Sequence, residues 1–288
     1  MRLGAFLPPW GEHATPADFD RLARAVEELG YDSLWTGDHV VFPMGVVSPY
    51  PYNATGAFPF DRGQPLFEPI TLLAYLAGRT STVRLGVSVL VLPMRNPVVT
   101  AKMLAGLDAL ALGRLELGVG VGWLREEFDA LAADFLARGD VADEWIAILR
   151  QLWTASRPTG FEGQHYSFSP LALVPRPDRR IPIAVGGNSR AALRRAARLG
   201  DGWHGVRLAP EQMAGMVGYL RGRLSEAGRD PADFRVALRT SIHPRHAARD
   251  LELYAAAGVD ELIVEVPGAN TDQRLRVLAG VRATWPPA

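Results

Sequence analysis

Hydrophobic positions along this chain follow two spacings, which succeed each other many times. The first apolar run, Leu3–Leu7, is continuous, whereas apolar residues between Phe19 and Leu29 recur every three or four positions. A continuous run is typical of a buried strand, and the wider spacing is typical of a helix that buries one face. Thr15 and Pro16 stand where a helix N-cap and first turn are expected. The chain therefore opens with a strand followed by a helix.

The same succession occurs eight times. The expected strands are Leu3–Leu7, Ser33–Thr36, Arg84–Leu90, Arg114–Val119, Ile181–Val185, Gly202–Val206, Arg235–Thr240 and Glu261–Glu265. The expected helices begin near Pro16, Glu68, Pro97, Asp140, Ser189, Pro210, Ala247 and Thr271. Eight strands that are each followed by a helix predict an α/β fold, a (β/α)8 TIM barrel. A doubly wound open sheet is the alternative.

The joints between helices and strands share one pattern. Gly30, Gly113, Gly200 and Gly258 each follow a helix and precede a strand by one or two residues. Glycine is frequent just past a helix end because it adopts a left-handed backbone without strain. Repeated joints of this kind indicate βα units and a parallel sheet.

Two segments exceed what a minimal barrel needs. Val40–Phe67, after the second strand, is rich in proline, aromatic residues and glycine, and Phe161–Pro177, before the fifth, alternates aromatic and polar residues. The second segment is expected to form a hairpin. Loops of this length are typical of lids or binding loops, and the aromatic content argues against disorder. We expect one domain over residues 1–288.

Composition narrows the possible partners. Lys and Arg total 31, as do Asp and Glu, so the formal net charge is zero and no basic run suggests nucleic-acid binding. The chain has no cysteine, which excludes disulfides and thiol chemistry. No run approaches the ~18 apolar residues of a membrane span, and the first residues do not resemble a signal peptide. We expect a cytoplasmic protein that binds neither nucleic acid nor membrane.

The unusual residues cluster at the carboxyl ends of the expected strands. Asp38 and His39 follow the second strand, "SVLVLPMRNP" extends the third, "GVGVGW" follows the fourth and "GGNS" follows the fifth. Active sites of such barrels form at this end. The histidines show no metal-ligand spacing with carboxylates, so we expect no metal site and no zinc-type hydrolysis.

Two of these motifs contain closely spaced glycines. In "GGNS", Gly186 and Gly187 allow close backbone approach, and Asn188 and Ser189 add polar groups at a helix start, which suits a phosphate. The alternative is a tight turn with Ser189 as an ordinary N-cap. In "GVGVGW", Gly120 and Gly122 would let a flat ligand lie against backbone, or serve close packing.

His39 is the strongest candidate for chemistry. It sits beside Asp38, at a strand end and ahead of the long loop. An imidazole there suits acid–base catalysis, with Asp38 as the group that orients it. Because the side chains of adjacent residues diverge, Asp38 could instead cap a turn or bond the loop. A structural histidine is the alternative.

Together these motifs resemble a known family. "DSLWTGDH", "VRLGVSVLVLPMRNPVVTAKMLAGLDALALGRLELGVGVGW" and "IPIAVGGNSRAALRRAARLGDGW" are similar to the bacterial luciferase-like superfamily, and most similar to its actinobacterial branch that uses the deazaflavin coenzyme F420. The resemblance implies a (β/α)8 barrel, a homodimer, and a flavin or deazaflavin ring at the carboxyl end. It implies a non-proline cis peptide at Ser88–Val89, against which the ring leans.

The resemblance also assigns roles to site residues. It places the cofactor phosphate at Gly186–Ser189 and His39 near the reacting ring carbon. The sugar-phosphate dehydrogenases of the family carry a glutamate acid where this chain has Trp123. That departure argues against sugar-phosphate oxidation and leaves Asp38, Glu126 and Glu127 as candidate proton donors.

These observations predict an oxidoreductase that moves a hydride between F420 and a small, apolar organic substrate. A monooxygenase that uses reduced FMN and oxygen is the first alternative, because the same barrel serves both. A non-catalytic flavin-binding protein on the same fold is the second.

Overall fold

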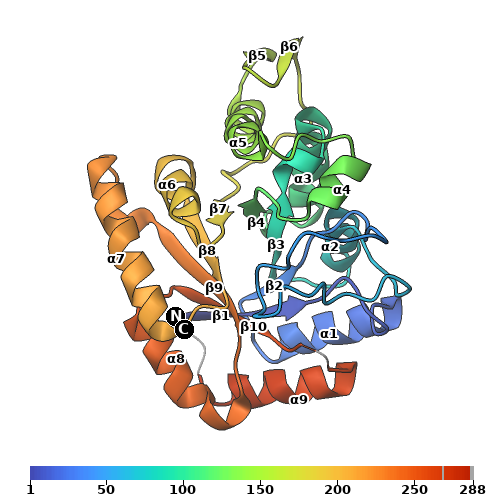
Figure 1. The fold of residues 1–288 in the computed structure, drawn as a ribbon, viewed down its shortest axis with the longest axis vertical. Coiled ribbons are helices and arrows are strands. Elements are labelled where there is room, and N and C mark those ends of the chain that lie inside the picture. The colour runs from blue at the N-terminus through green and yellow to red at the C-terminus, as the bar shows by residue number, and fades with distance from the viewer. Residues whose placement is uncertain (268, 286–288) are drawn as a thin grey trace.

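Eight parallel strands form a closed barrel in the computed structural model, which describes residues 1–267 and 269–285 (Figure 1). The order around the barrel is β1-β10-β9-β8-β7-β4-β3-β2. The barrel strands are β1 (Arg2–Leu7), β2 (Ser33–Thr36), β3 (Arg84–Val91), β4 (Leu115–Gly120), β7 (Ile183–Gly186), β8 (Gly202–Val206), β9 (Arg235–Ser241) and β10 (Glu261–Glu265). Because β1 pairs with both β2 and β10, the sheet has no edge, which confirms the predicted barrel and excludes the open sheet.

Helices surround the barrel, as Figure 1 shows. They are α1 (Pro16–Glu28), α2 (Pro69–Ala77), α3 (Pro97–Leu110), α4 (Arg125–Ala130), α5 (Arg138–Thr154), α6 (Arg190–Leu199), α7 (Pro210–Glu226), α8 (Ala247–Ala256) and α9 (Thr271–Arg282). Each expected helix is present and begins within two residues of its predicted start. The short α4 was not predicted. No helix in the described part of the chain is long and apolar enough to cross a membrane.

Local chemistry explains where the helices begin. Thr15 accepts a hydrogen bond from the amide of Asp18, and Asn96 caps α3 in the same way through its side-chain oxygen. A proline follows each cap, at a position where its missing N–H is no loss. By contrast, α4 has no side-chain cap, and the residue before it is Leu124. Its start therefore carries no sequence signal.

The glycines at the helix ends divide into two kinds. Gly30, Gly113 and Gly258 have φ between +75° and +88°, the left-handed backbone that was expected. Gly200 is extended instead, with φ −86° and ψ 162°. A Cβ on Gly200 would lie 2.8 Å from the carbonyl oxygen of Gly202, so this position needs glycine for space.

Both predicted insertions extend from the barrel. Residues 37–68 contain no helix and no strand, and cross the carboxyl end of the barrel. The hairpin is present as the antiparallel pair β5 (Thr159–Glu162) and β6 (Ser167–Leu171), somewhat shorter than the segment expected to form it. Figure 1 shows it projecting beyond α5, away from the barrel.

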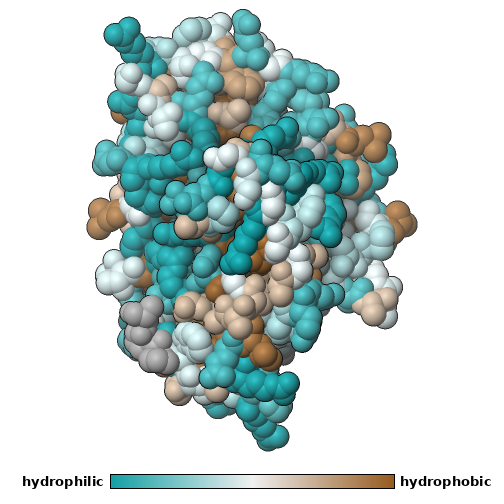
Figure 2. Space-filling view, turned by 90° about the vertical axis from the view of Figure 1, so that its left-hand side faces the viewer, coloured by the Kyte–Doolittle hydropathy of each residue, from teal (hydrophilic) through white to brown (hydrophobic). Residues whose placement is uncertain are grey.

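The two ends of the barrel differ in character. At the amino end, Glu261 accepts hydrogen bonds from Ser33 and Arg84 and forms an ion pair with Arg2. Arg84 also forms an ion pair with Glu116 on β4. This end is therefore lined by paired charges, while the carboxyl end opens into the larger cavity. The outer face that carries α7 is mainly hydrophilic, with apolar residues in small separate groups (Figure 2).

Candidate active site

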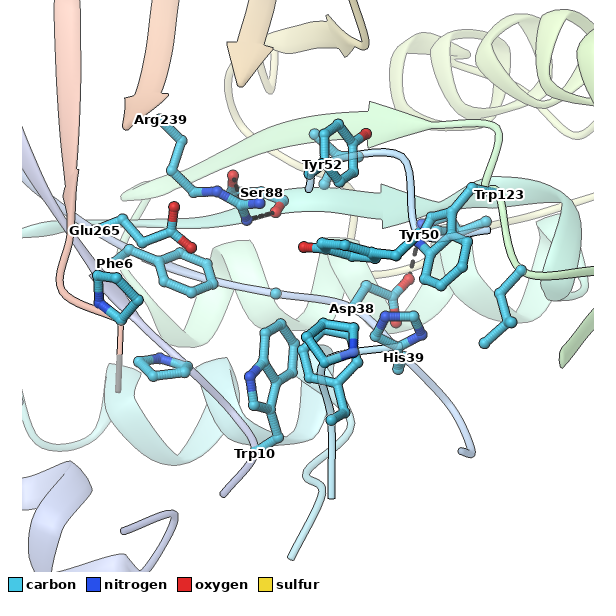
Figure 3. Close-up of a pocket in the computed structure, with 18 of the residues that line it drawn as sticks. Phe6, Trp10, Asp38, His39, Tyr50, Tyr52, Ser88, Trp123, Arg239 and Glu265 are labelled. Carbon is cyan, nitrogen blue, oxygen red and sulfur yellow. Dashed lines mark hydrogen bonds between the residues drawn. The ribbon is translucent and has the colours of Figure 1, made fainter. Parts of the chain in front are cut away.

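A cavity of about 700 Å³ lies at the carboxyl end of the barrel. Residues at or just beyond the ends of all eight barrel strands line it, among them Phe6, Gly37, Val89, Gly120, Gly186, Arg207, Arg239 and Glu265. Figure 3 shows Arg239 and Glu265 on one side of this cavity and His39 and Trp123 on the other, with Tyr50 between them. The cavity is large enough for a ring-shaped cofactor together with a small substrate.

His39 is held by a carboxylate from a distant part of the chain. Its Nδ1 lies 2.8 Å from Oε2 of Glu127 on α4. Both side chains are buried, with exposed fractions of 8% and 2%. Aromatic rings pack around the imidazole at centroid distances of 5.1 to 6.1 Å: Trp10, Phe42, Phe60 and Trp123. His39 therefore faces the cavity from a fixed and largely apolar setting.

Two neighbouring glutamates of α4 hold the long loop in place. Oε1 of Glu127 accepts hydrogen bonds from the amides of Val40, at 2.6 Å, and Val41, at 3.2 Å. Oε1 of Glu126 accepts from the amides of Val47 and Ser48 at 2.7 and 2.9 Å. Burial alone would raise the pKa of Glu126, but these amides outweigh it and lower the pKa to about 2. Both carboxylates thus act on the loop that covers the cavity.

Asp38 does not orient His39, contrary to the sequence-based expectation. Its Oδ2 accepts hydrogen bonds from the amide of Val91 and from Nη1 of Arg95, and its Oδ1 accepts from Nη2 of Arg95. The side chains of adjacent residues on an extended segment point in different directions, so the two neighbours have different partners. The carboxylate that contacts His39 is that of Glu127 instead.

Trp123 forms part of an aromatic wall. Its ring lies 5.2 Å from that of Tyr50 and 6.2 Å from that of Phe58, between ring centroids, and meets His39 edge-on. Phe42 and Phe60 stack nearly parallel beside His39. Where the resemblance places an acidic side chain, the cavity therefore has an apolar surface.

The peptide bond between Ser88 and Val89 is cis, as the resemblance implied. Three polar groups surround it: the Ser88 hydroxyl lies 2.7 Å from Nε2 of His204, and Arg239 donates to the carbonyl oxygen of Ser88 at 2.6 Å. Complete burial, and then the charge of Arg239, lower the pKa of His204 to about 3. His204 is therefore neutral, and its Nδ1 has no hydrogen-bond partner among the described residues.

The glycines near Val89 make room for its side chain. A Cβ on Gly118, Gly120 or Gly186 would lie 3.0, 2.6 or 2.7 Å from a methyl carbon of Val89. These glycines stand on β4 and β7, so two neighbouring strands leave space for one residue of β3. Packing thus accounts for part of the "GVGVGW" motif, while Gly120 still lines the cavity.

Gly122, the last glycine of that motif, packs against the side chains of Phe128 and Val91 rather than that of Val89. A Cβ there would meet Phe128 at 2.6 Å and Val91 at 2.8 Å, and the φ of Gly122 is +79°. The position therefore requires glycine for both its conformation and its space. Gly122 also lines the cavity.

In the "GGNS" loop, the two polar side chains do not serve as free phosphate ligands, because they form hydrogen bonds within the protein. Gly186 and Gly187 line the cavity, and Gly187 has φ +113°. The Asn188 side chain donates to the carbonyl of Val206 and accepts from its amide, and Ser189 caps α6 by accepting from the amide of Ala192. Both polar side chains are thus engaged within the protein. An anion held here would depend on backbone amides.

Sequence reasoning missed several polar residues of the site. Arg207 and Glu265, joined by hydrogen bonds of 2.8 and 3.0 Å, both line the cavity, and Figure 3 shows Glu265 on the side away from His39. Arg207 directly follows β8 and Glu265 ends β10, so the rule that strand ends carry the site could have found both. In the described residues, no group of three or more His, Cys, Asp or Glu side chains is placed to hold a metal ion.

The comparison with known proteins decides the family. The model of the luciferase-like monooxygenases matches residues 1–284. This chain belongs to that family. Its members are oxidoreductases or monooxygenases that depend on F420 or FMN, which confirms the predicted family and the expectation of an enzyme.

Sequence relatives include an uncharacterized protein and a protein described as a dehydrogenase. The uncharacterized protein Rv0940c of Mycobacterium tuberculosis (strain ATCC 25618 / H37Rv) is 36% identical over 208 residues, 72% of each chain. An F420-dependent glucose-6-phosphate dehydrogenase of Microbacterium testaceum (strain StLB037) is 31% identical over 240 residues, 80% of this chain and 64% of the relative.

Solved structures share the whole fold at lower identity. An F420-dependent secondary alcohol dehydrogenase in complex with an F420-acetone adduct superposes with a TM-score of 0.81 at 18% identity, over 99% of both chains. The monooxygenase RslO1 from Streptomyces bottropensis superposes with a TM-score of 0.77 at 22% identity, over 99% of this chain and 98% of the other. At such identities the likeness shows the common fold.

Proposed function

We propose that this luciferase-like enzyme is an oxidoreductase that transfers a hydride between coenzyme F420 and a small organic substrate. A relative at 31% identity and a solved structure over the full chain are both described as F420-dependent dehydrogenases. When bound, the deazaflavin supplies the hydride chemistry, and the protein supplies position, protonation and exclusion of water.

The cavity fits such a cofactor. The side chain of Val89 fills the space beside Gly120 and Gly186, so a flat ring would lean on Val89, as the resemblance implies. The predicted phosphate position at Gly186–Ser189 continues from this side of the cavity to the start of α6, where backbone amides point outward from the helix end. Gly187 is the central residue of that proposal, because a side chain there would obstruct backbone approach.

His39 is the observation that carries the proposal. Its imidazole stands at a rigid strand end, and among the described residues only its Nδ1 has a hydrogen-bond partner. Nε2 is thus the nitrogen that can take a proton from a substrate hydroxyl, or return one to a carbonyl oxygen, while the hydride moves. Asp38 supports the catalytic site from its pair with Arg95.

The aromatic wall indicates the kind of substrate. Trp10, Tyr50, Phe60 and Trp123 enclose the space in front of His39, and the loop that carries two of them is fixed to α4. Such a surface favours an apolar carbonyl compound or alcohol and excludes water when the ligand is bound.

Replacement of His39 tests the proposal directly. His39→Ala should slow reduction or oxidation of bound F420 by roughly 10² to 10⁴-fold, the usual contribution of general acid–base catalysis. The affinity for F420, measured by fluorescence titration, should change far less, because the proposed phosphate site lies on another loop. Equal rates in variant and parent would contradict the role of His39.

A monooxygenase is the second candidate, and the family name and the likeness to RslO1 favour it. Titration with oxidised and reduced F420 and FMN separates the two functions, since tight binding of reduced FMN with oxygen consumption would replace our proposal. Binding without turnover of any substrate would indicate a non-catalytic protein. The homodimer and the cytoplasmic location stay predictions, and sedimentation velocity tests the first.

A further inference from the structure

We propose that Glu127 is a positioning residue that fixes the tautomer of His39, so that Nε2 carries the lone pair that faces the substrate. The inference rests on the proposed function of His39 and extends it. Glu127 contacts the imidazole and the loop, and among its described hydrogen bonds none reaches another catalytic candidate.

The chemistry of the contact decides the tautomer. An ionised carboxylate can only accept hydrogen bonds, so the 2.8 Å contact requires the proton of a neutral imidazole to lie on Nδ1. Nε2 is then unprotonated and can act as a base. Because Glu127 is almost fully buried, water competes little for this hydrogen bond.

Among the described residues, Glu127 is the only charged group that hydrogen-bonds to His39. The Asp38 carboxylate, on the same strand end, is occupied by Arg95 and the amide of Val91. The aromatic rings packed around the imidazole are uncharged: Trp10, Phe42, Phe60 and Trp123. The orientation of the imidazole therefore depends on Glu127.

The same carboxylate links His39 to the loop. Oε1 of Glu127 accepts from the amides of Val40 and Val41, which begin the long loop, while Oε2 accepts from His39. These amides fix which oxygen faces the loop and which faces the imidazole. A displacement of the loop from α4 would therefore also disturb the position of His39.

This division of the two oxygens makes Glu127→Gln a sharp test. The amides of Val40 and Val41 need an acceptor, so the side-chain carbonyl of the glutamine should replace Oε1 and its NH₂ group should replace Oε2. The NH₂ group would then donate to Nδ1, which forces the imidazole proton onto Nε2. An isosteric change should thus invert the tautomer and remove the base.

Two measurements follow from this inversion. The first is the ¹⁵N chemical shifts of His39 in the ligand-free protein at about pH 9, well above the range in which a free imidazole titrates. The parent should show Nδ1 protonated, and Glu127→Gln should show Nε2 protonated. The second is F420-linked turnover, which should fall by roughly 10² to 10⁴-fold, the range for loss of a general base.

Glu126→Gln is the matched control, because Glu126 is adjacent, accepts from two loop amides and does not contact His39. It should leave the His39 tautomer unchanged. A parent protein with Nε2 protonated would overturn the inference even if Glu127→Gln failed to fold, and so would a folded Glu127→Gln with the parental tautomer. If the tautomer inverts as expected while turnover is unchanged, the positioning stands and the proposed role of His39 fails.

Discussion

Arg95 donates two parallel hydrogen bonds of 2.7 Å each to Asp38, and the Asp38 carboxylate is completely shielded from solvent. Glu68 lies 3.2 Å from the same guanidinium. The pair joins the end of β2 to the segment after β3 and so fixes the backbone from which His39 projects. It is a structural element of the catalytic site.

Removal of the arginine alone should destabilise the protein strongly. Arg95→Met would leave the buried Asp38 carboxylate without its counter-charge, which typically costs about 3–5 kcal/mol. Urea denaturation at pH 7 measures the loss. The double change Arg95→Met with Asp38→Leu should recover part of it, since no charge then stays buried. Unaltered stability of the single variant would show that the pair contributes little.

Trp123 should affect binding more than chemistry. Trp123→Ala removes a large apolar contact beside Tyr50, and the loss of such a contact, ~1.5–3 kcal/mol, corresponds to roughly a tenfold or greater rise in KM for an apolar substrate. Steady-state kinetics should show a smaller change in kcat. Trp123→Phe, which keeps a ring, should lie close to the parent. A fall in kcat at constant KM would instead point to a direct role in catalysis.

Gly187 provides a test of the phosphate position. Gly187→Val should weaken F420 binding, because the side chain would occupy the approach to the backbone. The φ of +113° also makes any side chain there strained, so Gly228→Val, at φ +67° in open space, serves as a control for strain alone. Isothermal titration and thermal unfolding separate the two effects. If both variants bind F420 like the parent, the loop does not hold the phosphate.

His204 should make the protein sensitive to acid. Its pKa is about 3 in the fold and 6.5 in the reference state, so its contribution is complete above pH 6.5 and is lost as the pH falls towards 3. Below pH 6.5 the loss approaches ~1.4 kcal/mol per pH unit. His204→Asn, which does not titrate, should flatten the dependence of unfolding free energy on pH between 7 and 4. An identical slope in variant and parent would exclude this source.

Local signals in the sequence were sufficient for most of the fold. Thr15 with Pro16, and Asn96 with Pro97, mark helix starts through interactions that span three residues or fewer. The six-residue α4 was not predicted, because the residue before it, Leu124, has no side chain that can cap a helix. Elements whose boundaries are set by nearby side chains can be predicted, whereas α4 begins without a capping side chain.

The site was only partly predictable for a related reason. The positions of Asp38 and His39 at a strand end followed from the pattern, but their partners Arg95 and Glu127 are 57 and 88 residues further along the chain. Such pairings depend on the closed barrel and on α4. Glu127 had been a candidate proton donor, but no local pattern in the sequence indicated its contact with His39.

The side chain of Val89 on β3 fits only because neighbouring positions on β4 and β7 are glycine. A Cβ at Gly118 or Gly120 of β4, or at Gly186 of β7, would come within 3.0 Å of a methyl carbon of Val89. A larger residue at Gly120 or Gly186 is therefore compatible with the barrel only if residue 89 becomes smaller, whereas a Cβ at Gly118 would also lie 2.5 Å from the carbonyl oxygen of Val87. Among related sequences, the identities at positions 89, 120 and 186 should change together, and a directed library that randomises residue 89 alone should recover few functional substitutions larger than valine.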